Sequence, residues 1–77
     1  MRVIPSARKR GYSDEDLFHA LRNYMDAFDG TDDLVLYVGP ALDGSLIEVD
    51  VADEDSDDPR IVHAMPARQQ FRPRTRW

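Results

Sequence analysis

Cysteine is absent from these 77 residues, so neither a disulfide nor a cysteine-ligated zinc ion can stabilise the fold. Long apolar runs are also missing, and none reaches the length of about 20 residues that a membrane-spanning helix needs. The first residues, Met1 to Pro5, lack the apolar core of a signal peptide. These absences favour a soluble protein of a reducing, cytoplasmic compartment, with no membrane partner.

The chain is short, and its length limits its core. A domain of about 60 residues buries only about 60% of the surface of its unfolded chain. We expect one domain over residues 1–71 and, over residues 72–77, a basic tail that is a candidate for disorder. Because disulfides are excluded, a homo-oligomer or a bound protein is the expected source of extra stability.

Acidic residues are missing from both ends of the chain. All 15 of them lie between Asp14 and Asp58, whereas nine of the ten cations lie in residues 1–11 and 60–77. A basic patch favours phosphate ligands, and an acidic flank favours a basic protein partner. Each charged run is equally compatible with ordinary solvated surface.

The apolar patterns predict an α+β fold. Ser13 can cap a helix that runs from Asp14 to Phe28 and stops at Gly30. Its apolar positions follow helical spacing: Leu17, Ala20, Leu21, Tyr24 and Phe28. Strands are expected near residues 2–5, 34–38, 46–51 and 60–65. The predicted order is β-α-β-β-β, with one amphipathic helix packed on a three- to four-stranded antiparallel sheet.

Within the predicted strands, alternation assigns side chains to faces. Glu48 and Asp50 alternate with valine and isoleucine and are expected to face water. By the same alternation, His63 is predicted to share a face with Ile61 and Met65, opposite Arg60, Val62 and Ala64. One interpretation makes His63 a half-buried sheet residue that hydrogen-bonds a neighbour. The other makes it an acid or base, because histidine titrates near neutral pH.

The cations around His63 support the second interpretation. Arg60 and Arg68 flank it in the sequence, and Lys9 and Arg10 lie beside it if the first strand pairs with the last. Metal-independent RNA cleavage needs a base for the 2′-hydroxyl, an acid for the leaving oxygen and cations for the phosphorane. The candidates are His63 and Arg68 for catalysis, with Lys9, Arg10 and Arg60 binding phosphate.

Other residues carry weaker signals. The acidic loop over residues 53–58 lacks the glycine and the closing glutamate of a calcium loop, so no metal and no cofactor is expected. His19, on the polar side of the helix, is expected at the surface. Phe71 can stack a base or close over an edge of the core, and we favour the core.

Three short motifs occur in the order found in a known family. They are Arg8-Lys9-Arg10-Gly11-Tyr12-Ser13, Gly44-Ser45-Leu46-Ile47-Glu48-Val49 and Arg60-Ile61-Val62-His63-Ala64. Together they resemble the BrnT-type toxins of bacterial toxin–antitoxin pairs, which are relatives of RelE. Residues 61–68 also resemble a segment of short actinobacterial toxin-like proteins. In this resemblance Lys9 matches the basic position of the family, Arg10 stands at its histidine and His63 at its serine.

The resemblance covers residues 7–71 and implies a RelE-like fold, ribonuclease activity on RNA and a DNA-binding antitoxin as protein partner. The first hypothesis is therefore a toxin of a type II toxin–antitoxin pair that acts as a metal-independent endoribonuclease. The alternative is a non-catalytic module of the same fold, which binds a protein through its acidic surface.

Overall fold

A computed structural model describes residues 1–71, which form one α-helix, two short 3-10 helices and five strands. The tail predicted over residues 72–77 lies outside the described residues. The elements in chain order are β1 (Arg2–Val3), η1 (Pro5–Arg8), α1 (Asp14–Arg22), β2 (Asp26–Asp29), β3 (Leu34–Pro40), β4 (Leu46–Ala52), β5 (Arg60–Pro66) and η2 (Gln69–Phe71). This arrangement confirms the α+β class. Within the described residues, no helix is long and apolar enough to cross a membrane.

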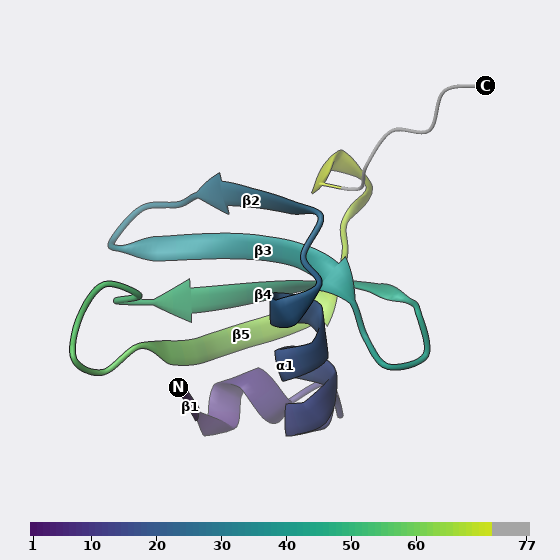
Figure 1. Ribbon diagram of the computed structural model, residues 1–77, viewed down its shortest axis with the longest axis horizontal. Coiled ribbons are helices and arrows are strands. Elements are labelled where there is room, and N and C mark those ends of the chain that lie inside the picture. Colours follow the sequence, from purple (N-terminus) through teal and green to yellow (C-terminus); the bar gives the residue numbers. More distant parts are fainter. Residues whose placement is uncertain (72–77) are drawn as a thin grey trace.

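The five strands form one sheet in the order β1-β5-β4-β3-β2 (Figure 1). Three neighbouring pairs are antiparallel, whereas β1 runs parallel to β5. The prediction of a three- to four-stranded antiparallel sheet is therefore wrong in two respects. The sheet has five strands, and β1 is parallel to its neighbour. The first strand does pair with the last, which was a condition of the predicted phosphate site: Arg2 lies opposite Arg60 and Val3 opposite Ile61.

The helix α1 begins where the sequence predicts. The amide of Asp16 donates to Ser13 Oγ at 3.1 Å, and the amide of Ser13 donates back to Asp16 Oδ2 at 3.2 Å. This reciprocal pair is a capping box, with Asp in place of the usual Glu or Gln. Three acidic residues in the first turn also suit the positive end of the helix dipole.

The same helix ends at Arg22, well before the predicted Phe28. Asn23 caps its C-terminus with two hydrogen bonds. The backbone amide and the side-chain Nδ2 of Asn23 both donate to the carbonyl of His19, at 3.1 and 2.9 Å. The residues expected to be its last turns form β2 instead. That strand pairs with β3, with Phe28 opposite Leu36. The predicted order β-α-β-β-β therefore lacks one strand.

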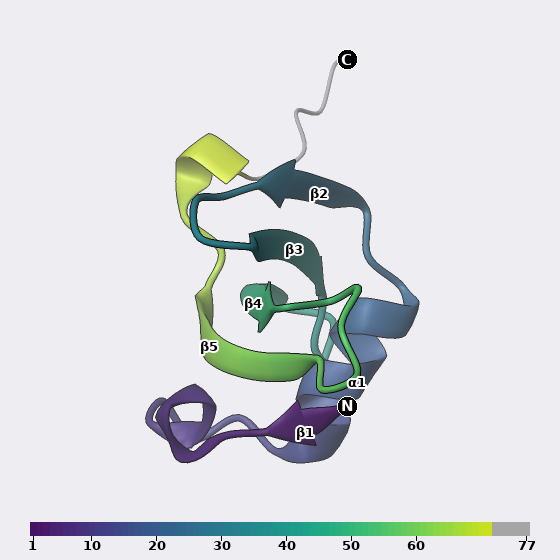
Figure 2. The same ribbon diagram turned by 90° about the vertical axis from the view of Figure 1, so that its left-hand side faces the viewer.

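The main core lies between α1 and one face of the sheet (Figure 2). Leu17 and Ala20 of the helix are fully buried there with Ile47, Val49 and Ile61, which confirms the predicted facing of these strand residues. Leu21 packs partly buried against this core. Tyr24, a predicted core residue, is 53% exposed, because the helix has already ended before it.

Candidate functional site

A bulge in β5 decides which side chains share the face of the sheet opposite α1. Asp50 pairs with His63 but Val51 pairs with Ile61, which leaves Val62 as an extra residue in β5. His63 therefore lies on the same face as Asp50, whereas the buried Ile61 lies on the helix face. The predicted grouping of His63 with Ile61 is wrong, since simple alternation does not allow for an inserted residue.

Glu48 lies on this second face and is buried, with 2% of its surface exposed. The backbone amide of Arg68 and its Nε donate to Glu48 Oε2 at 2.7 and 2.9 Å, and its Nη2 donates to Oε1 at 3.0 Å. The expectation that Glu48 faces water is therefore wrong. The chain that follows β5 crosses this face and brings a guanidinium over the carboxylate.

The crossing segment is also held by aromatic contacts. The guanidinium of Arg68 lies 4.8 Å from the centre of the Phe71 ring, and that ring lies 5.1 Å from the ring of Phe28 on β2. Phe71 thus packs against the edge of the sheet, as we favoured from the sequence. Figure 2 shows η2 on the side of the sheet away from α1.

On this face His63 lies beside Asp50. Its Nδ1 lies 3.8 Å from Asp50 Oδ2, with 45% of the histidine side chain and 25% of the aspartate side chain exposed. Burial raises the pKa of Asp50, and the carboxylate of Glu48 adds to this effect. The side chains of His63 and Arg68 act in the opposite direction. We call Glu48, Asp50, His63 and Arg68 the second-face cluster.

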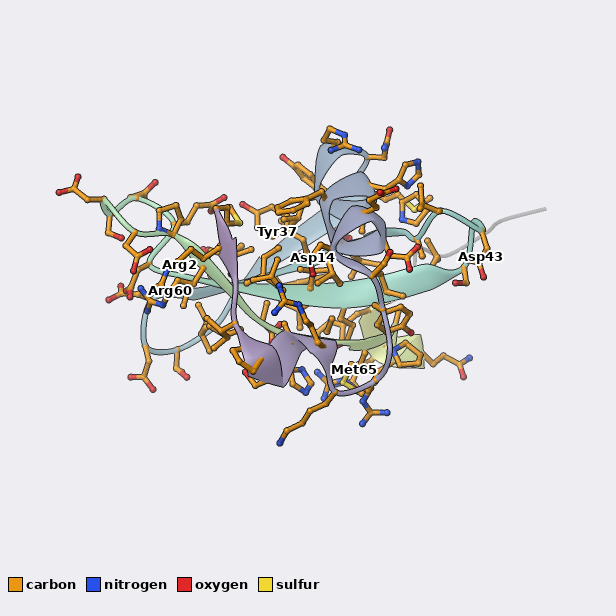
Figure 3. All side chains as sticks on the ribbon, turned by 90° about the horizontal axis from the view of Figure 1, so that it is seen from below. Arg2, Asp14, Tyr37, Asp43, Arg60 and Met65 are labelled. Carbon is orange, nitrogen blue, oxygen red and sulfur yellow. The ribbon has the colours of Figure 1, made fainter. Side chains whose placement is uncertain are left out.

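The structure separates Arg60 from this cluster. Arg60 Nη2 lies 2.5 Å from Asp53 Oδ2, and its Nη1 donates to the carbonyl of Asp58 at 2.8 Å. Arg2 holds the other side of Asp58, with Nε donating to Oδ1 at 2.9 Å. Figure 3 shows Arg2 and Arg60 close together at one end of the molecule, away from Met65. The guanidinium of Arg60 is thus already paired with two carboxylates, and its role in binding phosphate beside His63 stays a prediction.

The N-terminal basic segment lies beside β5. Ser6 Oγ donates to the carbonyl of Val62, the bulged residue, at 2.6 Å. Arg8 pairs with Asp14, its Nη2 lying 2.9 Å from Asp14 Oδ2. Lys9 and Arg10 form no ion pair with any residue of 1–71. The structure thus brings their segment to the strand that carries His63.

His19 is less exposed than the sequence suggests. Its Nδ1 lies 2.8 Å from the carbonyl oxygen of Pro40, in a partly buried contact between α1 and the end of β3. This contact gives His19 a structural role in docking the helix, and the expectation of a surface side chain is wrong.

A second feature was missed by the sequence reasoning. The β2–β3 turn and the β4–β5 loop lie at the same end of the sheet (Figure 1), where the amide of Asp53 donates to the carbonyl of Asp33 at 3.0 Å. They enclose an open hollow of about 490 Å³, lined by five carboxylates: Asp29, Asp33, Asp53, Glu54 and Asp55. We call Asp29, Asp32, Asp33 and residues 53–58 the acidic end.

The acidic end has an excess of carboxylates over cations. Of its acidic side chains, only Asp53 and Asp58 form ion pairs with residues of the described chain. No group of three or more histidine, aspartate or glutamate side chains within residues 1–71 is placed to hold a metal ion. The sequence shows both acidic runs. The pairing of β3 with β4, with Leu34 opposite Ala52, brings Asp33 beside the second run, and the unforeseen strand β2 adds Asp29.

Comparison with protein-family models, with curated proteins and with solved structures gave no match. A functional assignment for this chain must therefore start from the second-face cluster and the acidic end.

Proposed function

We propose that this domain is a protein-binding module that receives a basic segment of its partner at the acidic end. The observation that carries the proposal is the hollow lined by five carboxylates, of which only Asp53 has a cation paired with it among residues 1–71. An arginine or lysine of a partner would supply the missing counter-charge and form charge-assisted hydrogen bonds there.

The balance of charge favours a basic protein over a nucleic acid. The sequence contains 15 acidic side chains and ten cations, a net charge of −5. Four of these cations are already paired with carboxylates, namely Arg2, Arg8, Arg60 and Arg68. Phosphates would meet a repulsive field over most of this surface, whereas a basic segment would be attracted to it.

The proposal is tested with an oligolysine peptide as probe. The peptide should associate with the parent protein, and its association rate should fall as NaCl rises from about 20 to 500 mM, because salt screens exposed charges. Replacing Asp29, Asp33 and Asp55 together by asparagine should remove most of the binding. Glu15→Gln with Asp43→Asn removes charge away from the hollow and serves as control. Figure 3 places Asp43 at the end of the molecule opposite Arg2 and Arg60. Equal losses in both variants would count against a site at the acidic end.

Metal-independent RNA cleavage by a toxin of a type II pair is the second candidate. The 3.8 Å contact between His63 Nδ1 and Asp50 Oδ2 favours it, because a carboxylate can orient an imidazole for proton transfer. Arg68 binds Glu48 through Nε and Nη2, so its Nη1 can still approach a phosphate. In this candidate the acidic end would receive the antitoxin, and Lys9 and Arg10 would hold RNA. The expectation of a RelE-like fold is part of this second candidate.

Inducible expression in a bacterium, scored for growth arrest and loss of RNA, tests the second candidate. If it is correct, the parent protein arrests growth and His63→Ala abolishes the effect without changing the melting temperature. If the parent cuts no RNA with or without ribosomes, the binding module remains the better proposal. A His63→Ala variant that melts earlier but arrests growth normally would assign His63 to packing.

A further inference from the structure

We infer that β2 is the docking edge of this domain, and that an extended basic segment of a partner protein adds to it as a sixth strand. This inference rests on the proposed function, because it specifies how the basic segment reaches the acidic end. It starts from the backbone of β2, which is the last strand of the sheet on its side.

Among residues 1–71, the hydrogen-bond pattern leaves one side of β2 open. The amide of Gly30 donates to the carbonyl of Leu34 at 2.8 Å, which sets the alternation of an antiparallel ladder. By this alternation Phe28 exchanges backbone bonds with β3, whereas Ala27 and Asp29 direct their backbone groups outward. The amide of Ala27 accordingly donates to Oδ1 of its own neighbour, Asp26, at 2.9 Å. In a complex, a carbonyl of the incoming strand would accept the hydrogen bond of the Ala27 amide in place of Asp26 Oδ1.

The opposite edge of the sheet is a poorer docking edge. There β1 contains only two residues, and Arg2 is fastened to Asp58 by its guanidinium. β2 has four residues, and Ala27 at its centre is exposed. Exposed strand edges pair with other chains unless they are covered or charged.

The charges on β2 select the occupant. Asp26 and Asp29 bracket the strand, and Asp29 also lines the acid-lined hollow. A second copy of this chain would bring the same carboxylates alongside one another, and like charges across a ladder destabilise it. Lysine or arginine at alternate positions of an incoming strand would lie on one face of the sheet and would instead place cations beside Asp29. The edge therefore favours a basic segment over self-association.

The two ends of β2 offer different contacts, and these contacts specify the composition of the segment that would bind there. Tyr24 and Met25 come directly before β2 and are 53% and 58% exposed, so they offer apolar contact at one end. The hollow offers carboxylates at the other end. The segment that fits has an apolar or aromatic residue near one terminus and an arginine or lysine near the other.

The probe is a synthetic peptide that alternates valine and lysine and carries one terminal tyrosine. Its matched control has the same sequence with every backbone amide N-methylated, which keeps the charge but blocks strand pairing at both edges of the peptide. The parent peptide should bind at least about tenfold more tightly than the control, as expected for two lost backbone hydrogen bonds. Amide hydrogen exchange at Ala27 and Asp29 should slow in the complex with the parent peptide only.

A protein variant gives an independent measurement. Ala27→Pro removes the outward amide, at a position where an edge strand tolerates proline, and should weaken the parent peptide by a similar factor. Ala27→Val keeps the amide and should bind within about twofold of the parent protein, since an exposed side chain on the edge strand adds little to a ladder. The melting temperature of Ala27→Pro, measured without peptide, shows whether its fold is intact. If this variant does not fold, the comparison of the two peptides on the parent protein still tests strand addition.

The outcomes separate this inference from the proposed function. If both peptides bind equally and salt weakens both, the acidic end binds basic segments but strand addition is overturned. If neither binds, the proposed function fails as well. If light scattering shows a dimer of the parent protein that Ala27→Pro converts to a monomer, the occupant is a second copy and the basic segment is overturned.

Discussion

Gly39, which has no side chain, allows α1 to approach β3 closely. A Cβ atom at this position would lie 2.3 Å from the carbonyl oxygen of Ala20, which is backbone and cannot rotate away. Gly39→Ala should therefore lower the free energy of unfolding by about 1–3 kcal/mol, as overpacked cores do. Urea denaturation measures this change. Gly30→Ala, where the nearest atom would lie at 3.2 Å, should lose less, and a larger loss there would contradict the explanation.

Asp50 gives the residue-scale prediction for pH. Its folded-state pKa is raised above the ordinary value of 3.8, mainly by burial. As pH rises through this range, the unfolded chain releases the proton first, so the folded state loses stability. Asp50→Asn lacks this titration. Its free energy of unfolding should therefore improve relative to the parent between about pH 3 and pH 6, as urea denaturation at each pH would show.

Asp14 is the matched control, because its pKa shifts in the opposite direction. The guanidinium of Arg8 holds the pKa of Asp14 below its ordinary value, so this carboxylate stabilises the fold at higher pH and loses that effect as pH falls. Asp14→Asn should therefore lose stability relative to the parent over the range in which Asp50→Asn gains it. Parallel changes in the two variants would contradict the assignment of the two shifts.

At the scale of elements, Arg68 fastens the segment after β5 to the sheet. Arg68→Ala would leave the carboxylate of Glu48, only 2% exposed, without its guanidinium. The melting temperature should fall further than in Arg8→Ala, which breaks the exposed Arg8–Asp14 pair. Arg68→Lys should fall between the two, because lysine keeps the charge but not the two-pronged contact. Circular dichroism melts would compare all three, and equal losses would make the Glu48 contact unimportant.

Most elements could be predicted from local patterns, and the exceptions have a common cause. The start of α1 and the strands near β1, β3, β4 and β5 follow from Ser13, from turn residues and from apolar alternation. Tyr24 and Phe28 are four residues apart and fit a helix equally well, but pairing with β3 draws Phe28 into β2. Helical propensity is a weak preference that tertiary contacts override.

The candidate site was predictable only in part, for the same reason. Sequence reasoning placed Arg68 near His63 and considered a pairing of the first strand with the last. It did not foresee that Glu48 is buried, because the segment that covers it lies about twenty residues further along the chain. It also did not foresee the bulge at Val62, which no turn residue marks. Both depend on contacts between distant parts of the chain.

At the scale of the whole molecule, unpaired carboxylates gather at one end. Six of the eight acidic side chains of the acidic end form no ion pair with residues 1–71. Their mutual repulsion opposes folding and is screened by salt. Raising NaCl from about 10 to 150 mM should therefore raise the melting temperature, since the screening length shrinks over this range. Asp32→Asn with Asp55→Asn should melt higher at low salt and respond less to salt, and an unchanged response would contradict this explanation.

The parallel pairing of β1 with β5 imposes an order on events during synthesis. Arg2 leaves the ribosome 58 residues before its partner, Arg60. Closing so long a loop is entropically unfavourable until both strands are available, and contacts of this kind slow folding. The nascent chain therefore carries β1 and η1 without their sheet while β2, β3 and β4 are added. The sheet is completed only when β5 inserts between β4, which directly precedes it in the chain, and β1, which is made before the other four strands of this sheet.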